Sequence, residues 1–179
     1  MAHIKNKISS FFFKIKSLRK NLKKERFFFI FAIIIALIDL VSKHKIFNKF
    51  LMGRYYYNVN QYFNLTAVKN YGVSFGMFNK TPTALLILIN IILVSYIIYL
   101  IIKQDNKTKH ITIFKTGLAT ILGGAIGNIL DRIVNGYVRD FLDFHYKTHH
   151  WPAFNIADIA VCCGVLMIII FDLIQKNTK

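Results

Sequence analysis

The stretch TALLILINIILVSYIIYLII, Thr83–Ile102, contains no charged residue. A helix needs roughly 20 mostly apolar residues to cross about 30 Å of hydrocarbon. A helix buried in a soluble protein rarely stays apolar on every face for so long. We therefore expect this segment to span a membrane.

Three further stretches have a similar length and character. They run from Phe27 to about Ser42, from Ile111 to Leu130, and from about Ile156 to Ile174. Lys115 lies near one end of the third stretch, where we expect it to snorkel toward the interface. The predicted fold is an all-α integral membrane protein with four transmembrane helices.

Composition excludes several other classes of protein. The chain has 179 residues and a net charge of +16, but 55% of its residues are hydrophobic, which argues against a nucleic-acid partner. Its 17 phenylalanines exclude a disordered basic tail. Only two cysteines are present, the adjacent Cys162 and Cys163, so a disulfide-rich secreted domain is excluded as well.

Basic residues indicate the orientation in the membrane. Residues 1–26 hold nine basic residues and one acid, and the segments 103–110 and 175–179 are also basic. Positive charge favours the cytoplasm, so we expect both termini there. The connection 43–82 is basic too, which weakens this bias. We divide the chain into a basic segment 1–26, with a possible amphipathic helix or disordered tail, a single membrane-embedded domain 27–174, and a tail 175–179.

Five of the eight acidic residues fall at the same predicted face of the bundle. Span one ends near Asp39, span three closes at Asp131, span four opens at Asp158, and Asp140 and Asp143 lie between the last two spans. With helices of alternating direction, all five reach the outer face. Ionisable groups at membrane depth are costly, which makes them candidates for function.

Two neighbouring aspartates can share a proton. One then acts as a general base on water and the other as a general acid. Together they can hydrolyse a peptide bond without a covalent intermediate. The same aspartates could instead cap helices or pair with Arg132, Arg139 and Lys43. Spacing alone leaves both interpretations open.

Local patterns add detail around these acids. Gly123 and Gly127 form a GxxxG pair, which is typical of close helix packing. The alternating segment 136–144 predicts a strand, and the segment 64–76 is also strand-like. Pro152 suits an extended entry to the fourth span, and Asn155 is a candidate N-cap.

Together these segments resemble the lipoprotein signal peptidase family (signal peptidase II). The resemblance covers about residues 38–171 and rests on five ordered blocks, which are Asp39–Lys43, Asn70–Phe75, Gly123–Arg132, Val138–Phe141 and Phe154–Asp158. It implies four transmembrane helices with a small extracytoplasmic β-cradle. It also implies an aspartic endopeptidase that removes signal peptides from diacylglyceryl-modified prolipoproteins, cutting before the lipidated cysteine.

The resemblance assigns a role to each site residue. The catalytic aspartates match Asp140 and Asp158, whereas spacing alone does not choose between Asp140 and Asp143. Substrate-binding positions match Asn70, Asn128, Arg132 and Asn155, and supporting positions match Asp39, Lys43, Gly72 and Asp131. Arg139 departs from the apolar residue usual in the family, and strand alternation predicts that it points away from Asp140.

His145, His149 and His150 form the other cluster with possible chemistry. His145 and His149 would meet on a helix and bind zinc, but Trp151 and Pro152 favour a loop. We therefore expect no metal, and the resemblance implies no cofactor.

Two other functions fit a membrane protein with gathered acids. A small proton-coupled transporter predicts acids near the midplane and broken spans, whereas these acids lie at the outer edge. A helical anchor for a partner gives no reason for the polar residues to converge. We expect a monomer in the bacterial cytoplasmic (inner) membrane, in contact with lipid and lipid-modified prolipoproteins, with its active site at the outer face.

Overall fold

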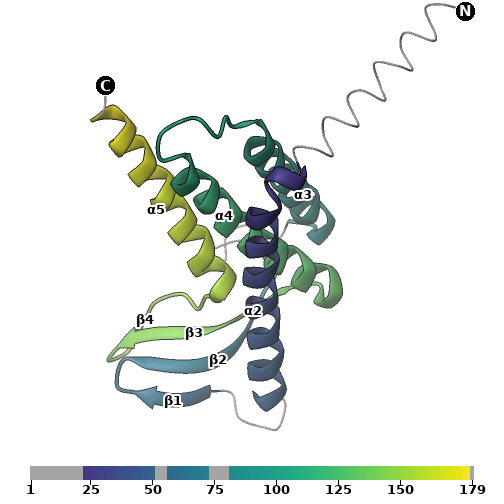
Figure 1. The fold of residues 1–179 in the computed structure, drawn as a ribbon. Helices are drawn as coiled ribbons and strands as arrows, with labels where there is room; N and C mark the ends of the chain where they lie inside the picture. Colours follow the sequence, from purple (N-terminus) through teal and green to yellow (C-terminus); the bar gives the residue numbers. More distant parts are fainter. Residues whose placement is uncertain (1–21, 51–55, 73–80, 178–179) are drawn as a thin grey trace, which may run out of the picture.

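The computed structural model describes residues 22–50, 56–72 and 81–177. It contains the helices α2 (Arg26–Phe50), α3 (Thr83–Lys103), α4 (Ile111–Asn135) and α5 (Ile156–Lys176). The strands are β1 (Tyr56–Asn60), β2 (Phe63–Asn70), β3 (Val138–Tyr146) and β4 (His149–His150) (Figure 1). The amphipathic helix suggested near the N-terminus lies mainly outside the described residues.

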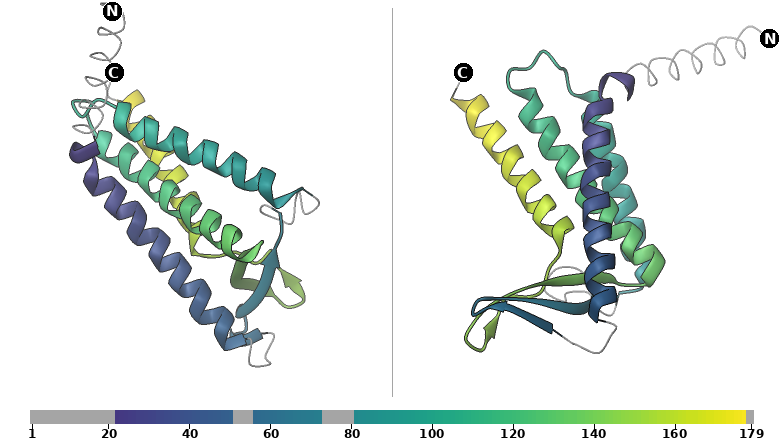
Figure 2. Two further views of the ribbon diagram at one scale, coloured as in Figure 1. Left: turned by 90° about the vertical axis from the view of Figure 1, so that its right-hand side faces the viewer. Right: turned by 60° about the horizontal axis from the view of Figure 1, so that its bottom comes forward.

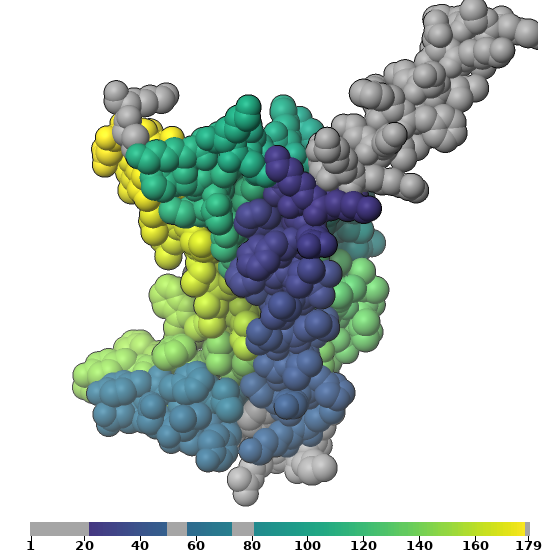
Figure 3. All heavy atoms as spheres, in the orientation of Figure 1, coloured from purple at the N-terminus to yellow at the C-terminus, as the bar shows by residue number. Residues whose placement is uncertain are grey.

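Four helices in the described part of the chain are long and apolar enough to cross a membrane, which confirms the predicted fold class. They form a bundle, and the sheet lies at one end of it. The start of α2, the α3–α4 connection and the end of α5 lie at the other end (Figure 2). In Figure 3 the sheet projects sideways from the foot of the bundle.

Two helices are longer than the sequence predicted. The first span was expected to end at about Ser42, but α2 continues to Phe50. It does so because Lys43 is fully buried and paired with Asp39 one turn earlier, so its charge does not end the helix. The third span was expected to close at Asp131, but α4 continues to Asn135 and ends at Gly136, whose φ is +80°.

Helix α4 is the centre of the bundle, because α2, α3 and α5 all pack against it. In its most apolar part, 50% of the residues are buried inside the protein, whereas the share is 11–22% in the other three helices. The glycine pair makes this packing possible. A Cβ at Gly123 would stand 2.6 Å from the Ala32 carbonyl oxygen, and one at Gly127 would stand 2.5 Å from an Asp39 carboxylate oxygen. The packing role expected for these glycines is confirmed.

The prediction that Lys115 snorkels is wrong. Its side chain is fully buried, and Nζ lies 2.9 Å from Glu25 Oε1 and 2.5 Å from Asn106 Oδ1. Asn106 also donates to Glu25 at 2.9 Å. A buried carboxylate compensates the lysine charge within the protein, so the side chain need not reach the interface.

The sheet is antiparallel in the order β1-β2-β3-β4. Strand β3 confirms the strand expected over 136–144, and β2 occupies part of the segment 64–76. The segment around the histidines is not a helix, as expected, but it is a β3–β4 hairpin rather than a loop and pairs His145 with His150. Backbone bonds between Leu142 and Phe154 join β3 to the segment that enters α5.

Candidate active site

A cavity of about 520 Å³ lies where the sheet meets the helices. Its polar lining comes from β2, the turn after β2, α3, α4, β3 and α5, and comprises Asn70, Gly72, Asn90, Asn128, Arg132, Asp140 and Asp158. Six of these seven residues were site candidates from the sequence. The fold therefore brings together polar groups that are up to 88 residues apart, from Asn70 to Asp158.

Asp140 lies on β3 and is only 3% exposed. Its two carboxylate oxygens accept hydrogen bonds from Asn70 Nδ2 at 3.0 Å and from Asn155 Nδ2 at 2.7 Å. Burial raises the pKa of the Asp140 carboxyl to about 7, and the negative charge of Asp158 contributes to the rise. The two amide donors oppose it, because they favour the ionised form.

Asp158 lies in the first turn of α5, where Asn155 caps the helix. The Asn155 side chain accepts from the Asp158 amide at 3.0 Å, and the Asp158 carboxylate accepts from the Asn155 amide at 3.0 Å. This capping box fixes both side chains on the backbone. The other Asp158 oxygen accepts from Asn128 Nδ2 at 3.0 Å.

Asn128 connects the two aspartates to a buried ion pair. Its side-chain oxygen accepts from Asn155 at 3.2 Å and from Lys43 Nζ at 2.7 Å. Lys43 in turn lies 2.7 Å from Asp39, which also accepts from the Ala157 amide at 2.9 Å. Asp39 and Lys43 thereby hold α2 against α4 and the start of α5, directly behind the cavity.

Asp131, which is buried, forms a second ion pair with the partly buried Arg139. The Arg139 guanidinium lies 2.6 Å from Asp131, and the Arg139 amide donates to the same carboxylate at 2.7 Å. The guanidinium also lies over the ring of Phe47. Arg139 therefore points away from Asp140, as strand alternation predicted.

The two interpretations of the aspartates overlap at one residue, because Asp158 also takes part in the capping box of α5. Asp39 and Asp131 form ion pairs, as the structural interpretation predicted. Among the described residues, Asp140 and Asp158 have no ion-pair partner and are held by amide donors only. Both carboxylates line the same cavity, and the charge of Asp158 raises the pKa of Asp140.

Arg132 lies one turn beyond Asn128 on α4 and is 5% exposed. It donates to the carbonyl oxygen of Gly72, whose amide donates to Asn70 Oδ1 at 2.9 Å. This arrangement leaves Asn70 with its NH₂ group toward Asp140. Within the described ranges, the buried Arg132 Nε has no hydrogen-bond partner, and the Arg132 side chain lines the cavity.

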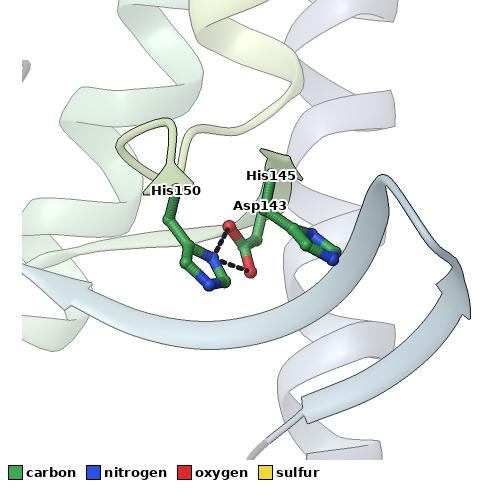
Figure 4. Close-up of side chains that lie close together, drawn as sticks. All are labelled: Asp143, His145 and His150. Atoms are coloured by element: carbon green, nitrogen blue, oxygen red, sulfur yellow. Dashed lines mark hydrogen bonds and ion pairs between the residues drawn. The ribbon is translucent and has the colours of Figure 1, made fainter. Parts of the chain in front are cut away.

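Asp143 does not line the cavity. It lies three residues further along β3, where His150 Nδ1 is 2.8 Å from one carboxylate oxygen and 3.0 Å from the other (Figure 4). Asn64 also donates to it at 3.1 Å. The structure thus separates the two candidates that spacing left open and brings only Asp140 to Asp158.

Comparison with known proteins identifies the family of the chain. The family model described as signal peptidase (SPase) II matches residues 31–174. The chain belongs to this family. A lipoprotein signal peptidase of Francisella tularensis subsp. novicida is 42% identical over 89% of this chain and 97% of its own length. One of Vibrio parahaemolyticus is 37% identical over 82% of this chain and 88% of its own.

Solved structures agree with this membership. A bacterial membrane enzyme determined at 2.3 Å resolution has a TM-score of 0.72 and 28% identity, and the match covers 84% of this chain and 89% of the other. Another, at 1.9 Å, has a TM-score of 0.68 with 28% identity, covering 80% of this chain and 90% of the other. As a signal peptidase II, the protein is a membrane peptidase that cleaves signal peptides, and its relatives place it in a bacterial inner membrane.

Sequence reasoning missed part of the peptidase cavity. Asn90 lines it from α3, and Cys162 and Cys163 line it from α5. Asn90 is the one amide in an otherwise apolar span, which was an available signal. Cys162 follows Asp158 by four residues and so shares its helix face. An apolar wall completes the cavity, from Trp151, Pro152, Ala153, Phe154 and Ile159.

Proposed function

We propose that this peptidase is an aspartic endopeptidase with Asp140 and Asp158 as its catalytic pair. Its substrates are diacylglyceryl-modified prolipoproteins, cut just before the lipidated cysteine. The observation that carries the proposal is the pair of carboxylates that form no salt bridge among the described residues and are held by amides in one cavity. No cofactor takes part, and the protein acts as a monomer.

The two carboxylates divide the proton chemistry between them. The pKa of Asp140 is raised to about 7, so we assign the proton of the catalytic pair to this residue. Ionised Asp158 removes a proton from a water molecule, which attacks the scissile carbonyl carbon while protonated Asp140 donates to the carbonyl oxygen. In the second step Asp158 returns its proton to the amide nitrogen. The C–N bond then breaks, and the diol oxygen gives its proton back to Asp140.

The surrounding amides and Arg132 position the substrate in this proposal. Asn70 and Asn155 fix the Asp140 carboxyl, and Asn128 fixes Asp158. The guanidinium of Arg132, which lines the cavity, donates to a backbone carbonyl of the extended substrate. The apolar wall faces the same cavity and accepts the acyl chains and the small residues beside the cut.

We further propose that the cavity opens at the outer face of the membrane. The end of the bundle opposite the sheet carries exposed Lys103, Lys107, Lys109 and Lys176. Positive charge favours the cytoplasm, so both termini lie there and the sheet is extracytoplasmic. The lipid anchor holds the scissile bond near that interface, at the depth of the two aspartates.

A lipopeptide cleavage assay in proteoliposomes tests the proposal. Asp140→Asn and Asp158→Asn should each lower the cleavage rate by at least about 100-fold, the contribution expected of a general acid or base. Asp143→Asn is the matched control, because this buried aspartate lies on the same strand outside the cavity. Full activity in Asp140→Asn or in Asp158→Asn would overturn the catalytic assignment. Equal cleavage of a precursor that lacks the diacylglyceryl group would overturn the proposed substrate class.

A further inference from the structure

Asp143, His145 and His150 gather at the part of the sheet that the proposed reaction does not use. Their potential ligand atoms all lie within 4.8 Å of one another. Figure 4 shows the two imidazoles on either side of the carboxylate, next to strand β2. We propose that these three residues bind a divalent transition-metal ion of the zinc class. The inference does not depend on the proposed peptidase mechanism.

The hairpin register creates this cluster. His145 on β3 pairs directly with His150 on β4, and Asp143 precedes His145 by two residues. Because side chains alternate along a strand, Asp143 and His145 share a face, and paired residues share it too. The spacing of His145 and His149 that suggested zinc on a helix is therefore irrelevant. His149 pairs with Tyr146 and belongs to the opposite face.

The distances are close to those that a metal requires. Zinc binds imidazole nitrogen and carboxylate oxygen at roughly 2.0–2.2 Å, which places two ligands of a tetrahedral site about 3.3 Å apart. His150 Nδ1 already lies 2.8 and 3.0 Å from the two Asp143 oxygens. The His145 ring is stacked on that of His150, with centroids 5.0 Å apart, and one of its nitrogens lies within 4.8 Å of the other potential ligand atoms.

A row of polar side chains supports the carboxylate from behind. Asn58 on β1 donates to Asn64 on β2 at 3.0 Å, and Asn64 donates to Asp143 at 3.1 Å. The same Asn64 amide lies 3.4 Å from His145 Nδ1. Asn64 is buried, so its side chain is held in place. Hydrogen bonds of this kind orient metal ligands and contribute strongly to affinity.

The cluster is open on the side that an ion would use. The His150 side chain is 51% exposed, whereas that of Asp143 is 12% exposed. Three protein ligands of this type leave a fourth position for water. Imidazole with carboxylate suits zinc and neighbouring divalent ions. A bound ion would link β3 to β4 and, through Asn64, to β2, and would thus stabilise the sheet that also carries Asp140.

The test uses the full-length protein in detergent, purified without a polyhistidine tag. Zn²⁺ is titrated in competition with a chromophoric chelator, and thermal unfolding is followed with Zn²⁺ or with EDTA. We expect one Zn²⁺ per chain and a melting temperature that rises with Zn²⁺, because the ion binds the folded state. His145→Ala and His150→Ala should each raise the dissociation constant by at least about tenfold, the lower limit for losing even an outer partner.

His149→Ala is the control on the same hairpin and should bind Zn²⁺ like the parent protein. For each variant, the rise in melting temperature is measured relative to the same variant in EDTA. A variant that is merely less stable is therefore not mistaken for one that has lost Zn²⁺ binding. Asn64→Ala should weaken binding without abolishing it. Absence of stoichiometric binding in the parent protein overturns the proposal, and so does an equal loss in His149→Ala and His150→Ala. Either result leaves the cleavage mechanism intact.

Discussion

Asn155 performs two tasks with one side chain. Its oxygen caps α5 by accepting from the Asp158 amide, while its NH₂ group donates to Asp140 at 2.7 Å. A carboxylate in its place keeps the cap but loses the donor, and it adds a negative charge beside Asp140. The residue therefore offers a way to separate the stability of the site from its chemistry.

Asn155→Asp should keep the helix cap and lose most of the cleavage activity. Asn155→Ala should lose activity and also about 1 kcal/mol of stability, the usual contribution of an N-cap. Thermal unfolding and lipopeptide cleavage, measured on both variants, check this. Full activity in Asn155→Asp would show that the donor to Asp140 is dispensable.

Asn70 adjusts the proton affinity of Asp140. The proposed mechanism needs Asp140 protonated, so cleavage should fall as the pH rises through about 7, the raised pKa of that carboxyl. The hydrogen bond from Asn70 lowers this pKa because it stabilises the ionised form. Asn70→Ala removes that effect, so the pKa rises.

The alkaline limb of kcat/KM should therefore move to higher pH in Asn70→Ala. The pH profile of the free enzyme reports this limb. Asn58→Ala is the control, because Asn58 bonds within the sheet to Asn64 and not to Asp140. A limb that moves to lower pH would contradict the assignment of Asp140 as the protonated partner.

At the scale of elements, the helices followed from the sequence better than the polar contacts between them did. Length and hydropathy predicted four spans, and alternating direction placed Asp39, Asp131 and Asp158 at one end. Lys115 was misjudged because its partner, Glu25, precedes the first span, and no periodicity links the two. The choice of Asp140 over Asp143 depends on strand pairing and on a register shift in β2 between Leu65 and Val68, which hydropathy does not encode.

The contact of α2 with α4 depends on Gly127. A Cβ there would stand 2.5 Å from Asp39 Oδ2, the oxygen that binds Lys43. Gly127→Ala should cost about 1–3 kcal/mol, as overpacking does, and should lower activity because Lys43 supports Asn128. Val134→Ala, at an exposed position of the same helix, should stay within about 0.5 kcal/mol. Thermal unfolding of both variants tests this, and equal melting temperatures would contradict it.

In the whole molecule, basic residues lie at both ends of the helix bundle. Among the described residues, Lys103, Lys107, Lys109 and Lys176 lie at the end opposite the sheet, which in the proposed orientation meets an anionic cytoplasmic leaflet. On the sheet side, Lys43 is neutralised inside the bundle, and Lys49 and Lys69 lie over the rings of Tyr57 and Tyr137. The charge of Lys43 is therefore compensated within the protein, whereas Lys49 and Lys69 keep their charge and reduce the bias that favours the proposed orientation.

The orientation itself can be tested with single cysteines, in a background where Cys162 and Cys163 are replaced by alanine. Lys107→Cys lies in the exposed α3–α4 connection, and Lys147→Cys lies in the exposed turn of the β3–β4 hairpin. A maleimide that cannot cross the inner membrane should label Lys147→Cys in cells with a permeabilised outer membrane. It should label Lys107→Cys only after the inner membrane is opened. The reverse pattern would place the aspartates at the cytoplasmic face, where the lipidated end of a translocated substrate could not reach them.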